Sequence, residues 1–175
     1  GLGDVYKRQV PRSKSIQTTP AHQLALAAVY YSPLQYMYWY DKPSDSQDEP
    51  ELKFFDDIYT TWDDTKVLQG EIGQFITIAR RKGEEWFIGS ITNNEARALP
   101  VSLDFLPEGK NYVAEIYTDG ERSIKTRTKV KCSRYRVNSM TKLNFELKAS
   151  GGSAVRLIPE KDVNKKLGNY KKQKL

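Results

Sequence analysis

The fold is decided by two apolar runs, Gln74-Phe75-Ile76-Thr77-Ile78-Ala79-Arg80-Arg81 and Trp86-Phe87-Ile88-Gly89-Ser90-Ile91. Both are rich in the β-branched and aromatic residues that strands favour. Lys82-Gly83-Glu84-Glu85 joins them, and a short connection that contains glycine is typical of a hairpin. The two runs therefore predict a pair of neighbouring antiparallel strands.

Further strands are predicted on the carboxyl-terminal side of this hairpin, because apolar and polar residues alternate there between turn signals. A half-buried strand shows this alternation, since successive side chains point to opposite faces. The predicted strands cover residues 101–105, 112–118, 124–132, 143–147 and 154–158. Seven or eight short strands with regular turn signals predict an antiparallel β-sandwich over residues 67–158, so the chain is expected to be mainly β.

The amino-terminal part of the chain instead predicts helices. Thr19-Pro20 starts a helix over 20–28, because the threonine side chain can cap free amides and proline has its φ angle set for the first turn. The β-branched and aromatic residues from 29 onward predict a short buried strand that ends near Ser32. Apolar residues at helical spacing predict a second helix over 50–59. Two helices and one strand cannot bury a parallel sheet, so this part looks like a fragment of a larger α/β unit.

Composition limits the class of protein to which the chain can belong. Its 175 residues are 38% apolar and 29% charged, which describes a globular protein and excludes a collagen-like or wholly disordered chain. No window approaches the roughly 20 continuous apolar residues of a membrane span. Much of the net charge of +6 lies in residues 159–175, where six lysines face two acidic residues. We expect this segment to be a basic, flexible tail and expect no nucleic-acid partner.

Few residues offer the chemistry of a metal or nucleophilic site. Cys132 is the only cysteine, which excludes an intramolecular disulfide and a cysteine-rich zinc site. His22 is the only histidine, so a catalytic triad cannot form within the chain, and a packed or capping role is expected for it. Residues 1–9 lack the apolar core of a signal peptide and resemble translated adapter sequence, so residues 1–11 are predicted to be a non-native or disordered leader.

Adjacent carboxylates are the remaining candidates for acid–base chemistry. The pairs are Asp56-Asp57, Asp63-Asp64 and Glu84-Glu85. Neighbouring residues on a strand or turn point to different sides, so a pair cannot place an acid and a base on opposite sides of one bond. No phosphate-loop or dinucleotide-binding glycine pattern follows a predicted strand. The sequence therefore predicts no catalytic residue, no cofactor-binding residue and no metal ligand.

An aromatic run, Tyr36-Met37-Tyr38-Trp39-Tyr40, follows Tyr30-Tyr31 closely in the chain. Aromatic rings stack against sugars or other ligands, and the carboxyl ends of strands surround the active site in a barrel of βα units. Tyrosine and tryptophan also gather in cores and domain interfaces, because they bury a large area. Both interpretations of the run remain open from the residues alone.

Five motifs occur in order along the chain. They are Thr18-Thr19-Pro20-Ala21-His22-Gln23-Leu24-Ala25-Leu26, Tyr31-Ser32-Pro33-Leu34-Gln35, Trp62-Asp63-Asp64-Thr65, the stretch from Gly73 through Ala79-Arg80-Arg81-Lys82-Gly83, and Trp86-Phe87-Ile88-Gly89. Their order and separations resemble the carboxy-terminal third of glycoside hydrolase family 97, over residues 12–158. The resemblance implies that residues 12–65 are the last helix, strand and helix of a truncated (β/α)8 barrel. Residues 67–158 would then be the whole carboxy-terminal β-sandwich.

The family consists of calcium-dependent exo-acting α-glucosidases and retaining α-galactosidases. The resemblance implies a bacterial, periplasmic or secreted parent enzyme that hydrolyses terminal α-linked sugars of an oligosaccharide. The family's catalytic carboxylates and calcium ligands lie upstream of the matched stretch, so calcium is expected in the parent and the fragment alone is predicted to be inactive. The resemblance also places residues 32–35 at the end of the eighth barrel strand. On that basis Gln35, Tyr36, Tyr38 and Trp39 are expected at the rim of the parent's sugar pocket.

Three roles remain open for the sandwich. It could support the barrel or subunit contacts of the parent, act as an independent carbohydrate-binding module, or serve only as an oligomerisation module. The expected partners are accordingly the barrel and amino-terminal domains of the parent chain and a second copy of the chain itself. The lysines and arginines of residues 125–131 form no aromatic platform for sugar, which disfavours the carbohydrate-binding role.

Overall fold

The computed structural model describes residues 17–35, 49–120 and 129–161. Its elements in chain order are α2 (Pro20–Val29), η3 (Pro50–Leu52), α3 (Lys53–Asp57), β1 (Asp64–Glu71), β2 (Phe75–Lys82), β3 (Glu85–Thr92), β4 (Arg97–Ser102), β5 (Tyr112–Asp119), β6 (Val130–Val137), β7 (Lys142–Leu147) and β8 (Gly152–Pro159). Six strands form one sheet in the order β1-β2-β3-β8-β5-β6, and β4 pairs with β7 in a second sheet. Every strand pair is antiparallel, which confirms the predicted fold class.

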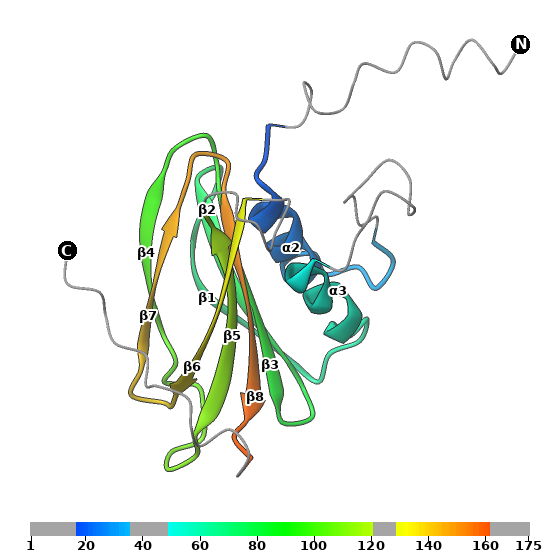
Figure 1. Cartoon of the computed structure of the whole chain (residues 1–175), viewed down its shortest axis with the longest axis vertical. Coiled ribbons are helices and arrows are strands. Elements are labelled where there is room, and N and C mark those ends of the chain that lie inside the picture. The colour runs from blue at the N-terminus through cyan, green and yellow to red at the C-terminus, as the bar shows by residue number, and fades with distance from the viewer. Residues whose placement is uncertain (1–16, 36–48, 121–128, 162–175) are drawn as a thin grey trace, which may run out of the picture.

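The molecule has three layers, with the six-stranded sheet in the middle. In Figure 1 the β4–β7 pair covers one face of this sheet, and α2 and α3 cover the other. Between the two sheets lies a core that includes Trp86, Ile88, Phe145 and Val155. A second core lies between the large sheet and the helices. The central strands are therefore buried on both faces, which explains why their sequences are nearly continuous apolar runs.

The side chains of strand β3 alternate between the two cores. Trp86 and Ile88 point toward β4 and β7, whereas Phe87 between them packs under the helices. The predicted hairpin is confirmed, because β2 and β3 pair from Phe75 opposite Thr92 to Lys82 opposite Glu85. Gly83 in the turn has a φ angle of 56°, a conformation that glycine adopts without a steric penalty.

Helix α2 begins where the sequence predicts. The Thr19 side chain accepts a hydrogen bond from the backbone N–H of His22 at 3.2 Å, so the predicted cap is confirmed. Small residues let the helix lie close to the sheet, and Gly89 on β3 faces it directly. A Cβ atom on Gly89 would lie 2.4 Å from the Ala25 carbonyl oxygen, so only glycine fits at this contact.

The predicted buried strand near Ser32 is wrong. Helix α2 continues through Val29, and the N–H of Tyr30 still bonds to the Leu26 carbonyl oxygen at 2.9 Å. Residues 30–35 belong to no strand, and Tyr31 is 84% exposed. A strand needs a neighbouring strand to satisfy its backbone groups, and none of the described strands pairs with this segment.

Other boundaries differ from the predictions by a few residues. The second helix forms as η3 and α3 and ends at Asp57, short of residue 59. Strand β4 spans Arg97–Ser102, whereas the sequence predicts a strand over 101–105. Its Pro100 is tolerated because β4 pairs with one neighbour only. The amino-terminal half of the predicted strand 124–132 lies outside the described residues, and β6 continues to Val137.

The structure describes only part of the predicted domains. The large sheet begins at Asp64, so β1 starts inside the segment that was assigned to the barrel end. The assignment of residues 12–65 to a barrel stays a prediction. The predicted leader, 1–11, lies outside the described residues, as does most of the predicted tail. Within the described part of the chain, no helix is long and apolar enough to cross a membrane.

Candidate functional site

The carboxyl-terminal end of α2 is held by a buried arginine from β2. Arg80 is only 2% exposed; its Nε donates to the Ala28 carbonyl oxygen at 2.6 Å and its Nη2 donates to the Val29 carbonyl oxygen at 3.0 Å. These carbonyls have no partner within the helix, and the helix dipole places partial negative charge there. The guanidinium also lies 5.5 Å from the ring centroid of Tyr31. One side chain thus ties the sheet to the helix, through contacts that suit a cation.

Gln35, the first of the predicted pocket-rim residues, takes part in the same helix end. Its Nε2 donates to the carbonyl oxygens of Ala27, Tyr30 and Ser32 at 3.3, 3.2 and 2.9 Å. The other three rim residues, Tyr36, Tyr38 and Trp39, lie outside the described residues. The pocket-rim role of the four residues therefore stays a prediction. Tyr30 and Tyr31, which precede the aromatic run, are exposed, so a core role does not apply to them.

A second arginine fastens α3 to the sheet. Arg156 on β8 is mostly buried, and its Nη1 lies 2.5 Å from Asp57 Oδ2 at the end of α3. The Nε atom donates to Glu85 Oε2 at 2.8 Å, and Glu115 Oε2 lies 3.9 Å from Nη1. Glu115 also pairs with Arg134 on β6 at 3.2 Å. The cluster joins α3 to four adjacent strands of the large sheet, β3, β8, β5 and β6.

The predicted carboxylate pairs have structural partners of this kind. Asp57 and Glu85 bind Arg156, and Glu84 binds Lys110 at 3.1 Å. Asp63 accepts from the backbone N–H of Gly83 at 2.7 Å, and this bond holds the pKa of Asp63 below its ordinary value. These contacts stabilise the fold through ion pairs and a backbone hydrogen bond.

His22 packs at the amino-terminal end of α2 against the turn before β8. Its Nδ1–H donates to the Gly151 carbonyl oxygen at 3.1 Å. Burial lowers the pKa of His22 below its ordinary value, although Asp119 nearby favours the charged form. The ring is therefore neutral and serves packing, in agreement with the packed role expected from the sequence.

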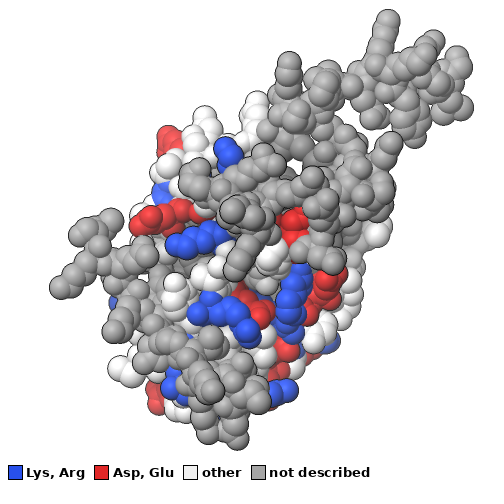
Figure 2. All heavy atoms as spheres, viewed as in Figure 1, with Lys and Arg blue, Asp and Glu red and all other residues white. Residues whose placement is uncertain are grey.

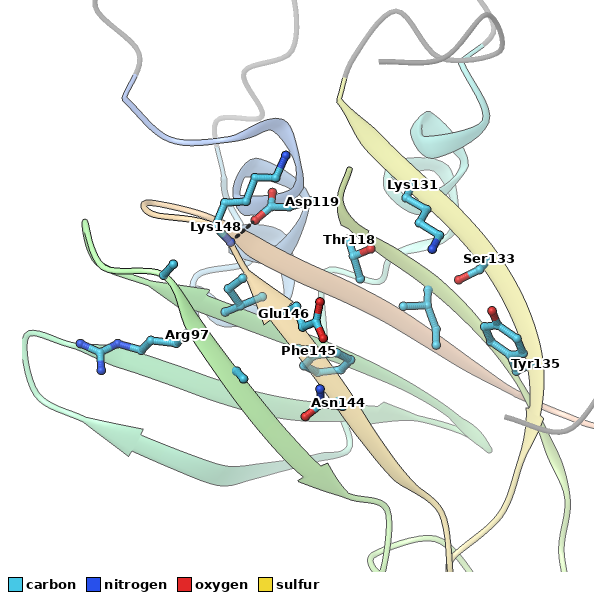
Figure 3. Close-up of a pocket in the computed structure, with 14 residues that line it drawn as sticks. Arg97, Thr118, Asp119, Lys131, Ser133, Tyr135, Asn144, Phe145, Glu146 and Lys148 are labelled. Carbon is cyan, nitrogen blue, oxygen red and sulfur yellow. Dashed lines mark hydrogen bonds between the residues drawn. The ribbon is translucent and has the colours of Figure 1, made fainter. Parts of the chain in front are cut away.

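A groove opens between the two sheets on the side of β6 and β7. It has a volume of about 520 Å³, with Ile116, Phe145 and Leu147 among its apolar lining residues. Figure 3 shows polar side chains from β5, β6 and β7 around it. Asp119 Oδ2 accepts from the backbone N–H groups of Lys148 and Gly152 at 2.9 and 3.2 Å, so this carboxylate joins strand ends. The lining contains neither histidine nor cysteine.

The described residues contain no group of three or more histidine, cysteine, aspartate or glutamate side chains that could hold a metal ion. They therefore do not fit a calcium site. In Figure 2, lysine and arginine side chains lie among aspartate and glutamate side chains on the visible described surface. Such mixing differs from the single-sign stripe with which proteins bind nucleic acids.

Comparison with known proteins decides the family. A family model described as glycosyl-hydrolase 97 C-terminal, oligomerisation, matches residues 61–158. The chain belongs to this family. The resemblance to glycoside hydrolase family 97 that the sequence motifs indicated is thereby confirmed, and the matched residues coincide with the β-sandwich.

Relatives of known activity place the glycosyl-hydrolase 97 domain within longer chains. A retaining alpha-galactosidase from Bacteroides thetaiotaomicron is 37% identical over 142 residues, which are 81% of this chain and 21% of the relative. The structure of a glycoside hydrolase family 97 enzyme from Pseudoalteromonas sp. strain K8 with acarbose matches with a TM-score of 0.74 and 36% identity, covering 83% of this chain and 23% of that chain. A beta-arabinopyranosidase, at a TM-score of 0.64 and 24% identity, shares the fold. The chain thus spans about a fifth of the length of its curated relative.

The predictions from the sequence do not include the two mostly buried arginines that join the helices to the sheet. Arg80 and Arg156 sit in strands where a charged residue ordinarily predicts a solvent-facing position. The spacing of Arg80 could have revealed its burial. Side chains of a strand alternate between its two faces, so Arg80 lies on the same face as Ile76 and Ile78. That spacing places the guanidinium on a face that is otherwise apolar, which marks it as a buried, paired arginine.

Proposed function

We propose that this chain is the carboxy-terminal part of an exo-acting α-glycosidase and that its β-sandwich supports the catalytic barrel and mediates subunit contacts. The observation that carries the proposal is the shared core between α2 and the large sheet, closed by Arg80. Helix α2 lies in the segment that the family resemblance assigns to the end of the barrel. A helix anchored to both parts would hold the barrel end in a fixed position relative to the sandwich.

The proposed substrate is a terminal α-linked sugar of an oligosaccharide. The 37% identical relative is a retaining alpha-galactosidase, which supports an α-galactoside, and an α-glucoside is the alternative. We propose calcium as a requirement of the parent enzyme, as the family resemblance implies, bound by residues upstream of the matched stretch. A periplasmic or secreted location of the parent belongs to the same proposal.

Gln35, Tyr36, Tyr38 and Trp39 are proposed to line the rim of the parent's sugar pocket. Support comes from the position of Gln35 just after the end of α2, where its side chain orders the chain that leads into the aromatic run. Aromatic rings at such a rim would stack on the apolar faces of a sugar. The sandwich would act on catalysis only through the position of this segment.

Activity measurements on nitrophenyl α-galactoside and α-glucoside test the proposal. The isolated chain is expected to show no turnover with or without calcium, whereas the full-length parent turns over one of the two substrates. In the full-length enzyme, Tyr38→Ala and Trp39→Ala should change kcat or KM, and Glu84→Ala, on the far hairpin, should leave both unchanged. Calcium-dependent turnover by the pure chain, or unchanged kcat and KM in both aromatic variants, would contradict the proposal.

Binding and light-scattering measurements separate the roles open to the sandwich. A domain that mediates subunit contacts is expected to self-associate and to show no affinity for α-linked oligosaccharides in calorimetry. The family model's description as an oligomerisation domain supports self-association. Measurable sugar affinity of the isolated chain would instead favour a carbohydrate-binding module, with the groove beside β6 and β7 as its site.

A further inference from the structure

Strand β1 leaves one edge of the large sheet unpaired, and apolar side chains are exposed along it. Among the described strands β1 pairs only with β2. Val67 is 66% exposed, and Ile72 in the turn after β1 is fully exposed. Beside them lies a hollow of about 570 Å³, lined in part by Gly70, Ile76 and Ile91. An unpaired edge that carries exposed apolar residues is a template for another strand.

The pairing of β1 with β2 shows on which face each side chain lies. Lys66 pairs with Ala79, and Glu71 pairs with Phe75, so both point to the face that carries the core between the sheets. Val67 pairs with Ile78 and Gly70 pairs with Ile76, which places these two on the opposite, helix-covered face. A bulge between Val67 and Gln69 separates the two halves of the strand.

We propose that β1 pairs antiparallel with β1 of a second copy of this chain, about a two-fold axis between Leu68 and Gln69. In this register Lys66 lies opposite Glu71 of the second copy, and the symmetry repeats the pair. Opposite charges directly across two strands attract each other. The inference rests on the proposed role in subunit contacts and assigns that role to one strand edge.

The apolar side chains fit the same register. Val67 lies opposite Gly70 of the second copy, where no side chain occupies the surface. The isopropyl group can therefore enter the hollow beside Ile76 and Ile91 of the second copy. Burial of Val67 at this position removes an exposed apolar side chain from water in each copy, which favours association.

Neighbouring registers are less favourable. A shift by one residue would put Val67 opposite a residue that points to the other face of the sheet. A shift by two residues in one direction would put Asp64 opposite Glu71 of the second copy, and like charges across strands repel. A shift by two in the other direction would leave Lys66 opposite Gly73. The bulge and the lysine thus restrict pairing to one arrangement, which is how natural edge strands avoid unselective aggregation.

Lys66 and Glu71 already have contacts within the chain, and both contacts can be given up when a second copy binds. Lys66 Nζ lies 3.6 Å from Asp64 Oδ2, and its side chain is 43% exposed. Glu71 accepts a hydrogen bond from Gln74 at the surface. Exposed contacts of this kind contribute little stability, so their loss costs little when the second copy binds.

Charge reversal tests the register. Sedimentation equilibrium of the full 175-residue chain should show a reversible dimer. Lys66→Glu and Glu71→Lys should each weaken the dimer by about tenfold or more, because each turns two attractive contacts into repulsive ones. The double variant K66E/E71K restores opposite charges and should return the Kd to within about threefold of the unaltered chain. Glu146→Lys, an exposed reversal on β7, is the control and should leave the Kd unchanged.

The outcomes separate this interface from the broader proposal. An unaltered chain that stays monomeric at every concentration would overturn both self-association and the β1 interface. A dimer that both single reversals leave intact, or that the double variant fails to restore, would overturn the β1 interface and leave self-association standing. Circular dichroism of each variant checks that the fold is retained. Val67→Asp should also abolish the dimer, and an unchanged Kd in that variant would contradict the fit of Val67 into the hollow.

Discussion

At the scale of single residues, Arg80 explains how helix α2 and the large sheet form one unit. Its guanidinium reaches the last carbonyl groups of α2 from a strand, and burial lowers its pKa from the ordinary value. Arginine stays charged in such a setting, because its pKa begins far above neutrality, and its fork of donors matches two carbonyls at once. Lysine could not supply a second donor in a fixed direction.

Replacing Arg80 with methionine is expected to destabilise the chain by about 3 kcal/mol, because two charge-assisted hydrogen bonds are lost and two carbonyl oxygens remain unpaired. Urea unfolding followed by tryptophan fluorescence measures the change. Arg81→Met is the matched control, since Arg81 is the next residue on β2 and its Nη1 donates to the Gly83 carbonyl oxygen in the turn rather than to a helix. Equal losses for the two variants would contradict the capping role of Arg80.

His22 makes stability depend on pH in a predictable direction. Burial lowers its pKa in the folded state, so between that pKa and the unfolded value near 6.5 the unfolded chain binds more protons. The contribution to stability is complete above pH 6.5 and is lost as the pH falls toward the folded pKa. The free energy of unfolding should therefore decline below pH 6.5, and less so in His22→Gln. A variant with the same decline as the unaltered chain would exclude His22 as the cause.

At the scale of elements, the contact between α2 and β3 depends on a single glycine. Gly89→Ala is expected to cost about 2 kcal/mol or more, because the added methyl group meets the Ala25 carbonyl oxygen and the helix must move away. Lys142→Ala, at an exposed position on β7, is the control and should change stability by less than about 0.5 kcal/mol. Thermal unfolding compares the two, and equal effects would mean that the helix adjusts freely.

The elements that could be predicted are those whose local signals agree with their surroundings. The hairpin of β2 and β3 and the Thr19 cap of α2 follow from short stretches of sequence. Strand β1 was missed because an edge strand exposes polar and apolar residues without a regular alternation. The strand near Ser32 was predicted wrongly because aromatic and β-branched residues favour strands only where a neighbouring strand exists. Distant contacts such as those of Arg80 and Arg156 leave little trace in the local sequence.

At the scale of the whole molecule, the helices and the sandwich share a core, so the chain should not divide at the start of the family match. A chain that begins at residue 61 would expose Phe87, Tyr117 and Ala154, which α2 and α3 cover. We expect it to bind a hydrophobic dye, to aggregate and to unfold at a lower temperature. Removal of residues 1–11 alone should change none of these properties. An undiminished unfolding temperature for residues 61–175 would show that the sandwich is independent of the helices.

The position of β8 has a consequence for how the chain acquires its structure. This strand is the last of the described strands, yet it lies in the centre of the large sheet between β3 and β5. During synthesis β3 and β5 therefore have no partner on their inner edges until residues 152–159 leave the ribosome. Pairings over such separations form slowly, and the exposed edges attract other chains in the meantime. Ribosome-bound chains that stop before residue 152 are consequently the species that chaperones are expected to bind most.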